Sequence, residues 1–485
     1  MKIRTFVFAF IFLFISSFAY GTKLTILSIN DTHGHLEGYP AISALVNKIR
    51  EEVKKDGGEV LFVHSGDFNT GTPESDMLKA EPDIEVFNQM GVDVATIGNH
   101  EFDNDFSVLR KQVKQAKFPF LLANVKPKDP KYFSFRPSMI KKIDGEDIYI
   151  IGVTTNDLKN LLLKKKGDLL ILKDPVAVVK DYISKLPKDS FVLVLSHLGA
   201  RGERKLGPDE IPDEELAEKV PGISVIVGAH SHTPIKRPRE VNGALIVQAG
   251  SYSEWLGRLD LEIEKGKVVD YRYELISTKG KDEDPKVRDI VNKYIEKSAE
   301  KLNVVIGVNS SFLDNKKSTR EETAIGDLAS DAMRAKGACD VAIQGGGGIR
   351  SSLKEGDIKV RDAFTVHPFG NTIVKTKLTG TELDSVLEEA EAKGKFMQVS
   401  GMNIHIKGND VKIDKIEGKK FSPNSSYLLC TDNFLAGGGD GFSKLNSIKR
   451  KKYTGIYVHD GLIDYIKKKG RIDYKVGDRI VLEKQ

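Results

Sequence analysis

The stretch at residues 24–35 reads LTILSINDTHGH, and its pattern recurs along the first half of the chain. An apolar, β-branched run, Leu24–Ile29, ends at the polar side chains Asp31 and His33. A short apolar run bounded by turn residues predicts a buried β-strand. Because ligands of open α/β sheets bind beyond the carboxyl ends of the strands, Asp31 and His33 are candidates for a binding site.

Four later apolar runs end in the same manner. These runs are Val60–Val63, Val92–Ile97, Phe191–Leu195 and Ile223–Val227. Together the five strand ends predict seven nitrogen and oxygen donors in one place: Asp31, His33, Asp67, Asn99, His197, His230 and His232. Such donors, without thiolates, suit zinc, manganese or another transition metal better than calcium. One residue separates the members of the pairs Asp31/His33 and His230/His232, so in extended backbone each pair points to one side.

Each motif has a plainer explanation when it stands alone. A Gly-Asp after a strand is often only a turn, and a lone His197 would more often be a hydrogen-bonded core residue than a ligand. The joint pattern resists this explanation, because five of the chain's ten histidines would have to lie at strand ends by accident: His33, His100, His197, His230 and His232. We therefore interpret the set as a metal site.

The chain has 485 residues, too many for one hydrophobic core, so we expect two domains. Strands that alternate with helical periodicity, as at Ile42–Val53, predict a layered α/β domain with mixed sheets over residues 22–276. A charged, turn-rich linker and an amphipathic helix, Val287–Leu302, follow over residues 277–303. Residues 304–485 predict a second α/β domain.

Composition excludes some classes of protein. The formal net charge is 74 − 69 = +5 and is spread along the chain, so we expect no binding of duplex nucleic acid. The tract Lys164–Lys166 is interpreted as a solvated surface. Two cysteines, Cys339 and Cys430, do not make a disulfide scaffold, and the sequence leaves open whether they are free or bridged.

The N-terminus predicts export. Lys2 and Arg4 precede the apolar run Phe6–Ile15 and then small residues, which is the order of a secretory signal over residues 1–21. The apolar run is short for a bilayer span, although an uncleaved anchor stays an alternative. We expect a secreted or periplasmic protein with no stable membrane span after signal removal.

The order of these motifs resembles that of the calcineurin-like metallophosphoesterases. NDTHGH at residues 30–35 and GNHEFD at residues 98–103 are similar to the family of 5′-nucleotidases, UDP-sugar hydrolases and 2′,3′-cyclic-nucleotide phosphodiesterases. The second half resembles the C-terminal domain of that family through GGGGIR at 345–350, PFGN at 368–371, Asn433-Phe434 and GGDG at 438–441. The resemblance covers essentially the whole chain after the signal, and it implies an αββα sandwich followed by a substrate-binding domain.

The resemblance also implies roles for residues. One divalent metal ion would be held by Asp31, His33, Asp67 and His232, and a second by Asp67, Asn99, His197 and His230. His100 would be catalytic and paired with Asp103, while a water activated by the two metals attacks phosphorus. Phe369 and Phe434 would sandwich a nucleobase, with Arg350, Asn371 and Asp440 binding the remaining polar groups. Two positions depart from the family. Gly345 stands where many members have Asn. The family has an arginine before a helix, and Arg320, which lies near the expected position, is the candidate for it.

The working hypothesis is an exported, monomeric hydrolase of small-molecule nucleotides that uses two divalent metal ions. It could remove 5′-phosphates, open 2′,3′-cyclic phosphates or split UDP-sugars. One alternative is a hydrolase of another ester with the same architecture, such as a thiosulfohydrolase, which would not need the base sandwich. Another is a nucleotide-binding surface protein without activity, which would not need the His100–Asp103 pair.

Overall fold

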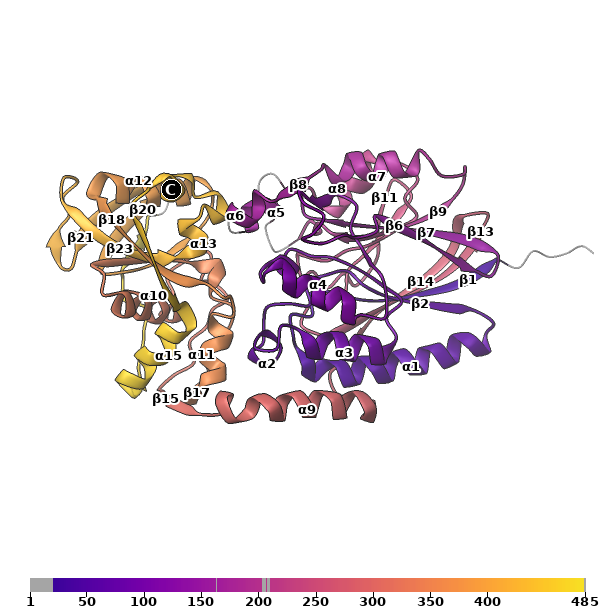
Figure 1. The fold of residues 1–485 in the computed structure, drawn as a ribbon, viewed down its shortest axis with the longest axis horizontal. Helices are drawn as coiled ribbons and strands as arrows, with labels where there is room; N and C mark the ends of the chain where they lie inside the picture. The colour runs from indigo at the N-terminus through magenta and orange to yellow at the C-terminus, as the bar shows by residue number, and fades with distance from the viewer. Residues whose placement is uncertain (1–20, 163, 203–205, 207–209, 484–485) are drawn as a thin grey trace, which may run out of the picture.

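The computed structural model describes residues 21–162, 164–202, 206 and 210–483, so the expected signal, apart from Gly21, lies outside the described residues. Two α/β domains lie side by side, and the long helix α9 (Pro285–Leu302) runs beneath the first and leads into the second (Figure 1). The expected two-domain α/β fold with mixed sheets is thereby confirmed. The domain limits expected at residues 276 and 304 stay a prediction.

The first domain contains two six-stranded mixed sheets. The first sheet has the order β14-β13-β1-β2-β3-β4, and the second has the order β11-β12-β10-β9-β7-β6. Strands of the first are β1 (Thr22–Ile29), β2 (Glu59–His64), β3 (Val94–Thr96), β4 (Phe120–Leu121), β13 (Trp255–Glu264) and β14 (Lys267–Ser277). Strands of the second are β6 (Ser138–Ile143), β7 (Glu146–Thr154), β9 (Phe191–His197), β10 (Val225–Val227), β11 (Arg239–Val241) and β12 (Ala244–Val247).

The two sheets pack face to face, and helices cover both outer faces. Leu24 and Leu61 of the first sheet share one buried cluster with Leu193 and Val225 of the second. The helices are α1 (Tyr39–Lys55), α2 (Pro73–Asp76), α3 (Glu81–Met90), α4 (Phe106–Gln115), α5 (Leu158–Leu161), α6 (Lys164–Gly167), α7 (Pro175–Ile183) and α8 (Asp213–Lys219), with short 3-10 helices η1 (Leu36–Gly38) and η2 (His100–Phe102). A further two-stranded ladder joins β5 (Val125–Pro127) to β8 (Leu170–Leu172). Because central strands are covered on both faces, their sequences are continuous apolar runs.

The strand directions decide where the site lies. β1, β2 and β3 run parallel to one another, as do β9 and β10 in the second sheet. β1 begins at the end of the molecule far from the second domain and runs toward it (Figure 1). The loops that follow these strands therefore face the second domain.

The second domain has a five-stranded sheet of order β19-β16-β23-β18-β24 and two smaller sheets, β17-β15-β25 and β22-β21-β20-β26. Its strands are β15 (Val305–Asn309), β16 (Val341–Gly345), β17 (Gly356–Lys359), β18 (Thr372–Thr379), β19 (Met397–Ser400), β20 (Met402–Lys407), β21 (Asp410–Ile416), β22 (Lys419–Lys420), β23 (Ser426–Asp432), β24 (Lys451–Tyr457), β25 (Arg471–Ile472) and β26 (Ile480–Leu482). Its helices are α10 (Ala324–Gly337), α11 (Val360–Val366), α12 (Gly380–Ala392), α13 (Asn433–Ala436), α14 (Ser443–Ser447) and α15 (Val458–Lys469), with 3-10 helices η3 (Gly346–Gly348) and η4 (Gly439–Gly441).

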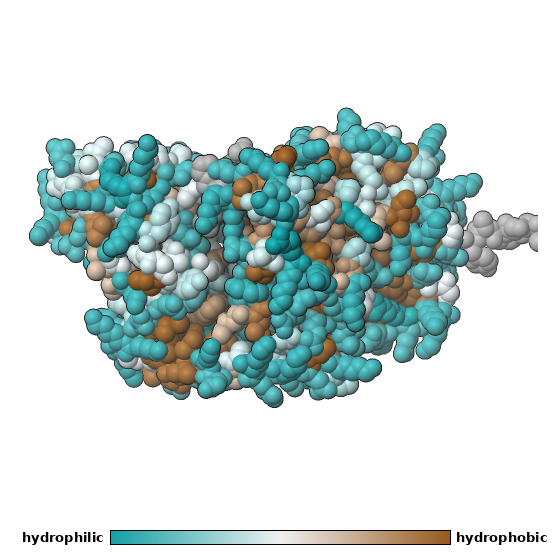
Figure 2. Space-filling model, viewed as in Figure 1, coloured by the Kyte–Doolittle hydropathy of each residue, from teal (hydrophilic) through white to brown (hydrophobic). Residues whose placement is uncertain are grey.

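Helix α9 and an ion pair link the two domains. Val287, Val291 and Tyr294 of α9 are buried in the core of the first domain. An ion pair joins the two domains directly: Arg361 of α11, in the second domain, lies 2.9 Å from Glu74 of α2, in the first. Within the described ranges, no helix is both long and apolar enough to cross a bilayer. Hydrophilic side chains cover most of the face in Figure 2, and apolar ones gather in small patches.

A disulfide resolves the question that the two cysteines left open. Cys339, which follows α10, is bonded to Cys430 of β23, and 91 residues separate them along the chain. Both side chains are buried. The bridge therefore ties α10 to the central sheet of the second domain.

We predict that the Cys339→Ala/Cys430→Ala variant is less stable than the parent by roughly 2–5 kcal/mol, because a crosslink over so long a loop restricts the unfolded chain. The measurement is chemical denaturation without reductant. Parent treated with a thiol reductant should approach the variant. Equal midpoints for parent and variant would show that the bridge does not stabilise this domain.

Candidate active site

The loops after five strands bring the seven sequence-predicted donors together. Asp31 and His33 follow β1, Asp67 follows β2 and Asn99 follows β3, while His197 ends β9 and both His230 and His232 follow β10. Potential ligand residues form three overlapping sets, and within each set the ligand atoms lie within 4.8 Å of one another: Asp31/His33/His232, His33/Asp67/His100 and Asp67/His197/His230. Side chains from both sheets thus meet at one point.

Asp67 lies at the centre of the group. Its Oδ2 is 3.0 Å from Nε2 of His197 and 4.0 Å from Nε2 of both His33 and His100. Its Oδ1 accepts a hydrogen bond from the backbone N–H of His100 at 2.9 Å. The residue is 1% exposed, so a carboxylate here requires positive charge nearby.

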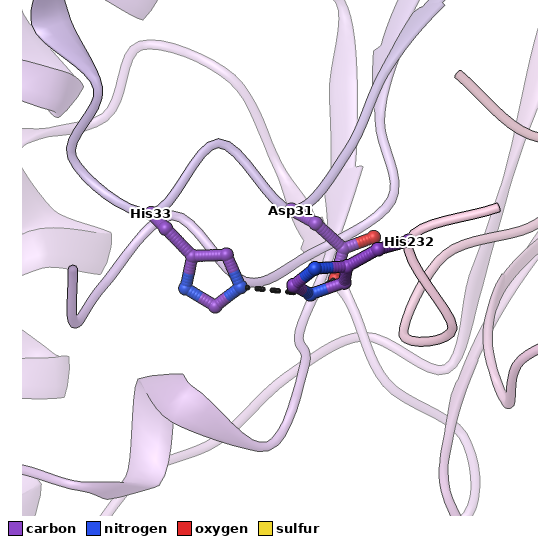
Figure 3. Close-up of side chains that lie close together, drawn as sticks. All are labelled: Asp31, His33 and His232. Carbon is purple, nitrogen blue, oxygen red and sulfur yellow. Dashed lines mark hydrogen bonds and ion pairs between the residues drawn. The ribbon is translucent and has the colours of Figure 1, made fainter. Parts of the chain in front are cut away.

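The second group of donors lies beside Asp67. Figure 3 shows the rings of His33 and His232 turned toward each other, with the carboxylate of Asp31 next to them. The two Nε2 atoms are 3.2 Å apart, and Nε2 of His232 is 3.5 Å from Asp31 Oδ1. The three donors therefore surround a common point.

Backbone carbonyls orient two of the imidazole rings. Nδ1 of His33 lies 2.7 Å from the carbonyl oxygen of Thr70, and Nδ1 of His197 lies 2.7 Å from that of Ser65. A carbonyl can only accept, so each Nδ1 carries the proton in this assignment. The Nε2 lone pairs of both rings are then directed into the cluster, as in metal-binding histidines.

The backbone of the ligand loops corrects one expectation. Asp31, His33, His230 and His232 have φ of +49°, +49°, +69° and +55°, so the paired ligands do not lie on extended backbone. This left-handed conformation is uncommon outside glycine and is enriched at active sites. The pairs converge through tight turns and not through strand alternation.

Gly98 shows why one of the loops needs a glycine. A Cβ at this position would lie 2.2 Å from Asp67 Oδ1 and 2.7 Å from the Asp67 nitrogen. The loop after β3 can therefore approach Asp67 only without a side chain there. This close approach places Asn99 beside the central carboxylate.

The donor set fits a divalent transition metal. Asn99 is 6% exposed, and its Oδ1 accepts no hydrogen bond from any residue that the structure describes. An orphaned buried oxygen is costly unless it binds a cation or another partner. Together with the imidazole nitrogens that face the cluster, it makes a set of nitrogen and oxygen ligands. Such a set suits zinc or manganese.

Charge in the cluster is balanced by the histidines. Burial lowers the pKa of His33 well below its usual value. Burial also disfavours charged His197, but Asp67 and Asp31 outweigh it and raise the pKa of His197 to about 10. Metal binding requires neutral imidazole, so a bound cation would supply the positive charge in place of the protons.

The His100–Asp103 pair forms as the sequence predicts. Nδ1 of His100, in η2, lies 2.7 Å from Oδ2 of Asp103, three residues on. Burial lowers the pKa of His100, but the Asp103 and Asp67 carboxylates outweigh it and raise this pKa above its usual value. The other ring nitrogen faces the cluster.

A cavity of ≈ 570 Å³ extends from this cluster into the second domain. The five predicted substrate-binding residues all line it: Arg350, Phe369, Asn371, Phe434 and Asp440. Asp67, Asn99, His100, Asp103 and His230 line the end that belongs to the first domain. Arg320 and Gly345 also line the cavity, and a Cβ at Gly345 would meet nothing closer than Leu435 at 3.7 Å.

Phe369 joins the two halves of the cavity. Its ring stacks on that of His100, with centroids 5.8 Å apart and planes at 24°. The guanidinium of Arg350 lies 5.8 Å from the centre of the same ring. Phe434 is half-buried beside Gly439, and Asp440 pairs with Lys395 at 3.0 Å. Neither aromatic ring is a fully buried core residue.

The sequence did not indicate several residues that hold the site. The buried Glu101 carboxylate accepts hydrogen bonds from the backbone N–H groups of Asp67, Phe68, Asn69 and Gly98. Buried His64 accepts from the Gly66 N–H and donates to Thr32, and Glu210 lies 2.9 Å from Nε2 of His230. Their partners are backbone groups or distant side chains, which leave no local pattern; only the position of Glu101 beside His100 was a signal.

Lys166 contradicts the expectation of a solvated lysine tract. Its Nζ donates to the carbonyl oxygens of Phe102, Asp103 and Asn104 at 3.1, 2.5 and 2.9 Å, and it lines the cavity. These carbonyls end the turn that carries His100 and attract a cation. The lysine-rich composition of the tract hid this contact.

Comparisons with known proteins agree with the geometry. The family model described as calcineurin-like phosphoesterase matches residues 24–234, and the model described as 5′-nucleotidase, C-terminal domain, matches residues 299–447. Protein UshA of Yersinia enterocolitica is 32% identical over 504 residues, covering 93% of this chain and 92% of that protein. A 5′-nucleotidase of Vibrio vulnificus is 30% identical over 504 residues, covering 93% and 91%. The structure of a 5′-nucleotidase precursor from Thermus thermophilus superposes with a TM-score of 0.84 at 26% identity, covering 96% of this chain and 100% of that chain.

We predict that Glu101→Gln destabilises the metal-free protein by about 2–4 kcal/mol. Each carboxylate oxygen accepts two backbone N–H groups, so the amide NH₂ of glutamine faces two donors in either orientation. Chemical denaturation measures the loss. The matched control is Glu51→Gln, at an exposed position of α1, which should unfold with the parent. A Glu101→Gln midpoint equal to that of the control would contradict the role of Glu101.

Proposed function

The chain belongs to the 5′-nucleotidase family of calcineurin-like phosphoesterases and is a phosphoric ester hydrolase, and from this premise we propose that it is an exported nucleotide phosphohydrolase that uses two divalent metal ions. The substrates are small-molecule nucleotides: 5′-monophosphates, and also UDP-sugars or 2′,3′-cyclic nucleotides. The observation that carries the proposal is the cavity, which has Asp67, Asn99 and His230 of the donor cluster at one end and the rings of Phe369 and Phe434 at the other.

Asp31, His33, Asp67 and His232 hold one cation in this proposal, and Asp67, Asn99, His197 and His230 hold the other. The central position of Asp67 supports a bridging role, because its carboxylate lies close to histidines of both sets. Divalent cations in these places would act as Lewis acids toward phosphate oxygens and lower the pKa of a water molecule. The protein supplies donors that its own hydrogen bonds already orient, as at His33 and His197.

His100 stabilises charge on the phosphoryl group. With Nδ1 held by Asp103, the ring presents Nε2 toward Asp67 Oδ2 at 4.0 Å, at the wall of the cavity. A protonated ring in this position donates a hydrogen bond to a phosphoryl oxygen as negative charge builds there. The carboxylate of Asp103 keeps the ring oriented and favours the protonated form. No covalent intermediate is required.

The second domain holds the nucleoside. Phe369 and Phe434 line the cavity and, in this proposal, bind the base by stacking, which accepts every base. Arg350, Asn371 and Asp440 provide charged and polar contacts for the remaining groups. We place the protein outside the cytoplasm, because residues 1–21 have the order of a secretory signal. We also propose that it is a monomer.

Two alternatives fit less well. A hydrolase of a non-nucleotide ester, such as a thiosulfohydrolase, has no use for two aromatic rings in the cavity. A silent nucleotide-binding protein has no use for a formed His100–Asp103 pair. A panel of nucleotides, thiosulfonate esters and simple phosphate esters, assayed before and after chelation, separates the three. Release of phosphate from AMP that is lost on chelation and restored by manganese or zinc supports the proposal, and release that ignores chelation contradicts it.

We predict that His100→Ala retains the parental metal content but loses turnover by about 10²–10⁴-fold, because the residue acts on the phosphoryl group and is not among the seven ligands. Metal analysis and kcat for AMP measure the two effects. His405→Ala, at a histidine on β20 that does not line the cavity, is the matched control. Parental turnover in the His100 variant would remove His100 from the mechanism.

We predict that Phe434→Ala raises KM for AMP and UMP by about tenfold or more, because each base loses a stacking partner. KM for β-glycerophosphate, which has no base, should stay unchanged. Phe312→Ala, at an exposed ring outside the cavity, is the control. Equal rises in KM for nucleotides and for β-glycerophosphate would show that Phe434 shapes the cavity without binding the base.

A further inference from the structure

Thr70, in the loop between β2 and α2, contacts both halves of the candidate catalytic machinery. Its hydroxyl donates to Oδ2 of Asp103 at 2.7 Å. Its carbonyl oxygen accepts the hydrogen bond from Nδ1 of His33 at 2.7 Å. One residue is therefore joined to the carboxylate that orients His100 and to a histidine of the metal cluster.

The conformation of Thr70 is unusual for its type. It has φ of +64°, a left-handed value that is a genuine outlier for a β-branched residue. The residue is 8% exposed and so is held inside the protein. Strained residues of this kind persist where the surroundings over-determine them, and they gather at functional sites. Here, the hydrogen bonds of Glu101 to the preceding residues hold the loop in place.

The hydroxyl of Thr70 fixes the Asp103 carboxylate. Oδ2 of Asp103 accepts from both the Thr70 hydroxyl and the His100 ring, each at 2.7 Å. The Asp103 side chain is 25% exposed, so it could otherwise turn toward water. Two donors on one oxygen hold the carboxylate, and through it the ring of His100, in a single orientation.

We propose that Thr70 is a positioning residue that aligns the His100–Asp103 pair with the metal cluster, through its hydroxyl on one side and its carbonyl on the other. This inference rests on the proposed function. Thr70 touches neither metal nor substrate in this scheme and acts only through Asp103 and His33. Loss of the hydroxyl should therefore affect kcat and leave metal binding intact, because the carbonyl is unchanged.

The experiment compares Thr70→Val with Thr70→Ser in the full-length, metal-loaded protein. Valine keeps the branched shape and removes only the donor, so we expect kcat for AMP to fall about tenfold or more while KM changes less than twofold. Serine keeps the hydroxyl and should stay within about threefold of the parent. Equal losses in both variants, or none in Thr70→Val, would overturn the proposal.

A double-mutant comparison tests whether Thr70 acts through Asp103. In an Asp103→Ala background the hydroxyl has no acceptor, so adding Thr70→Val should lower kcat less than twofold further. A further tenfold loss would mean that the two residues act independently, which the proposal forbids.

Readouts that do not depend on turnover complete the test. Metal content should be parental in Thr70→Val; lost metal would assign the hydroxyl to the cluster and overturn the proposal. In metal-free protein, the ¹⁵N resonances of the His100 ring should shift in Thr70→Val and not in Thr70→Ser. If the parent releases no phosphate from any nucleotide, the proposed function fails, whereas active parent with an unaffected valine variant rejects only the role of Thr70.

Discussion

The Asp67 carboxylate is the constraint on which the site depends. It is buried among three imidazole rings, and burial of an unpaired carboxylate would be strongly unfavourable. Its position requires that the loops after β2 and β3 approach closely, which Gly98 and Glu101 make possible, and that His197 of the second sheet lie 3.0 Å from its Oδ2. The packed sandwich supplies rigid strand ends, and the loops that follow them carry the chemistry.

The two domains contribute different groups to the cavity. The first domain presents donors for cations and the His100–Asp103 pair, while the second presents aromatic rings and Arg350. The stack of Phe369 on His100 shows that the two sets are adjacent and not merely in the same molecule. A substrate that spans the cavity would therefore be contacted by both domains.

The sequence predicted the strands and the place of the polar residues that follow them, because both leave local signals. A buried strand is a continuous apolar run, and the polar residues that follow Leu24–Ile29 or Val60–Val63 mark its end. The left-handed backbone of Asp31 and His33, in contrast, depends on tertiary contacts, so strand alternation gave the wrong local geometry. Glu101 and Lys166 bond to backbone groups, and Thr70 bonds to two side chains, Asp103 and His33, that are 33 and 37 residues away; composition alone cannot reveal such partners.

The central claim is that Asp67 is shared by two cations. Crystals of the protein soaked in manganese, measured near the manganese absorption edge, test it most directly. We expect two anomalous peaks, one beside Asp31, His33 and His232 and one beside Asn99, His197 and His230, with Asp67 between them. A single peak, or peaks away from Asp67, would contradict it.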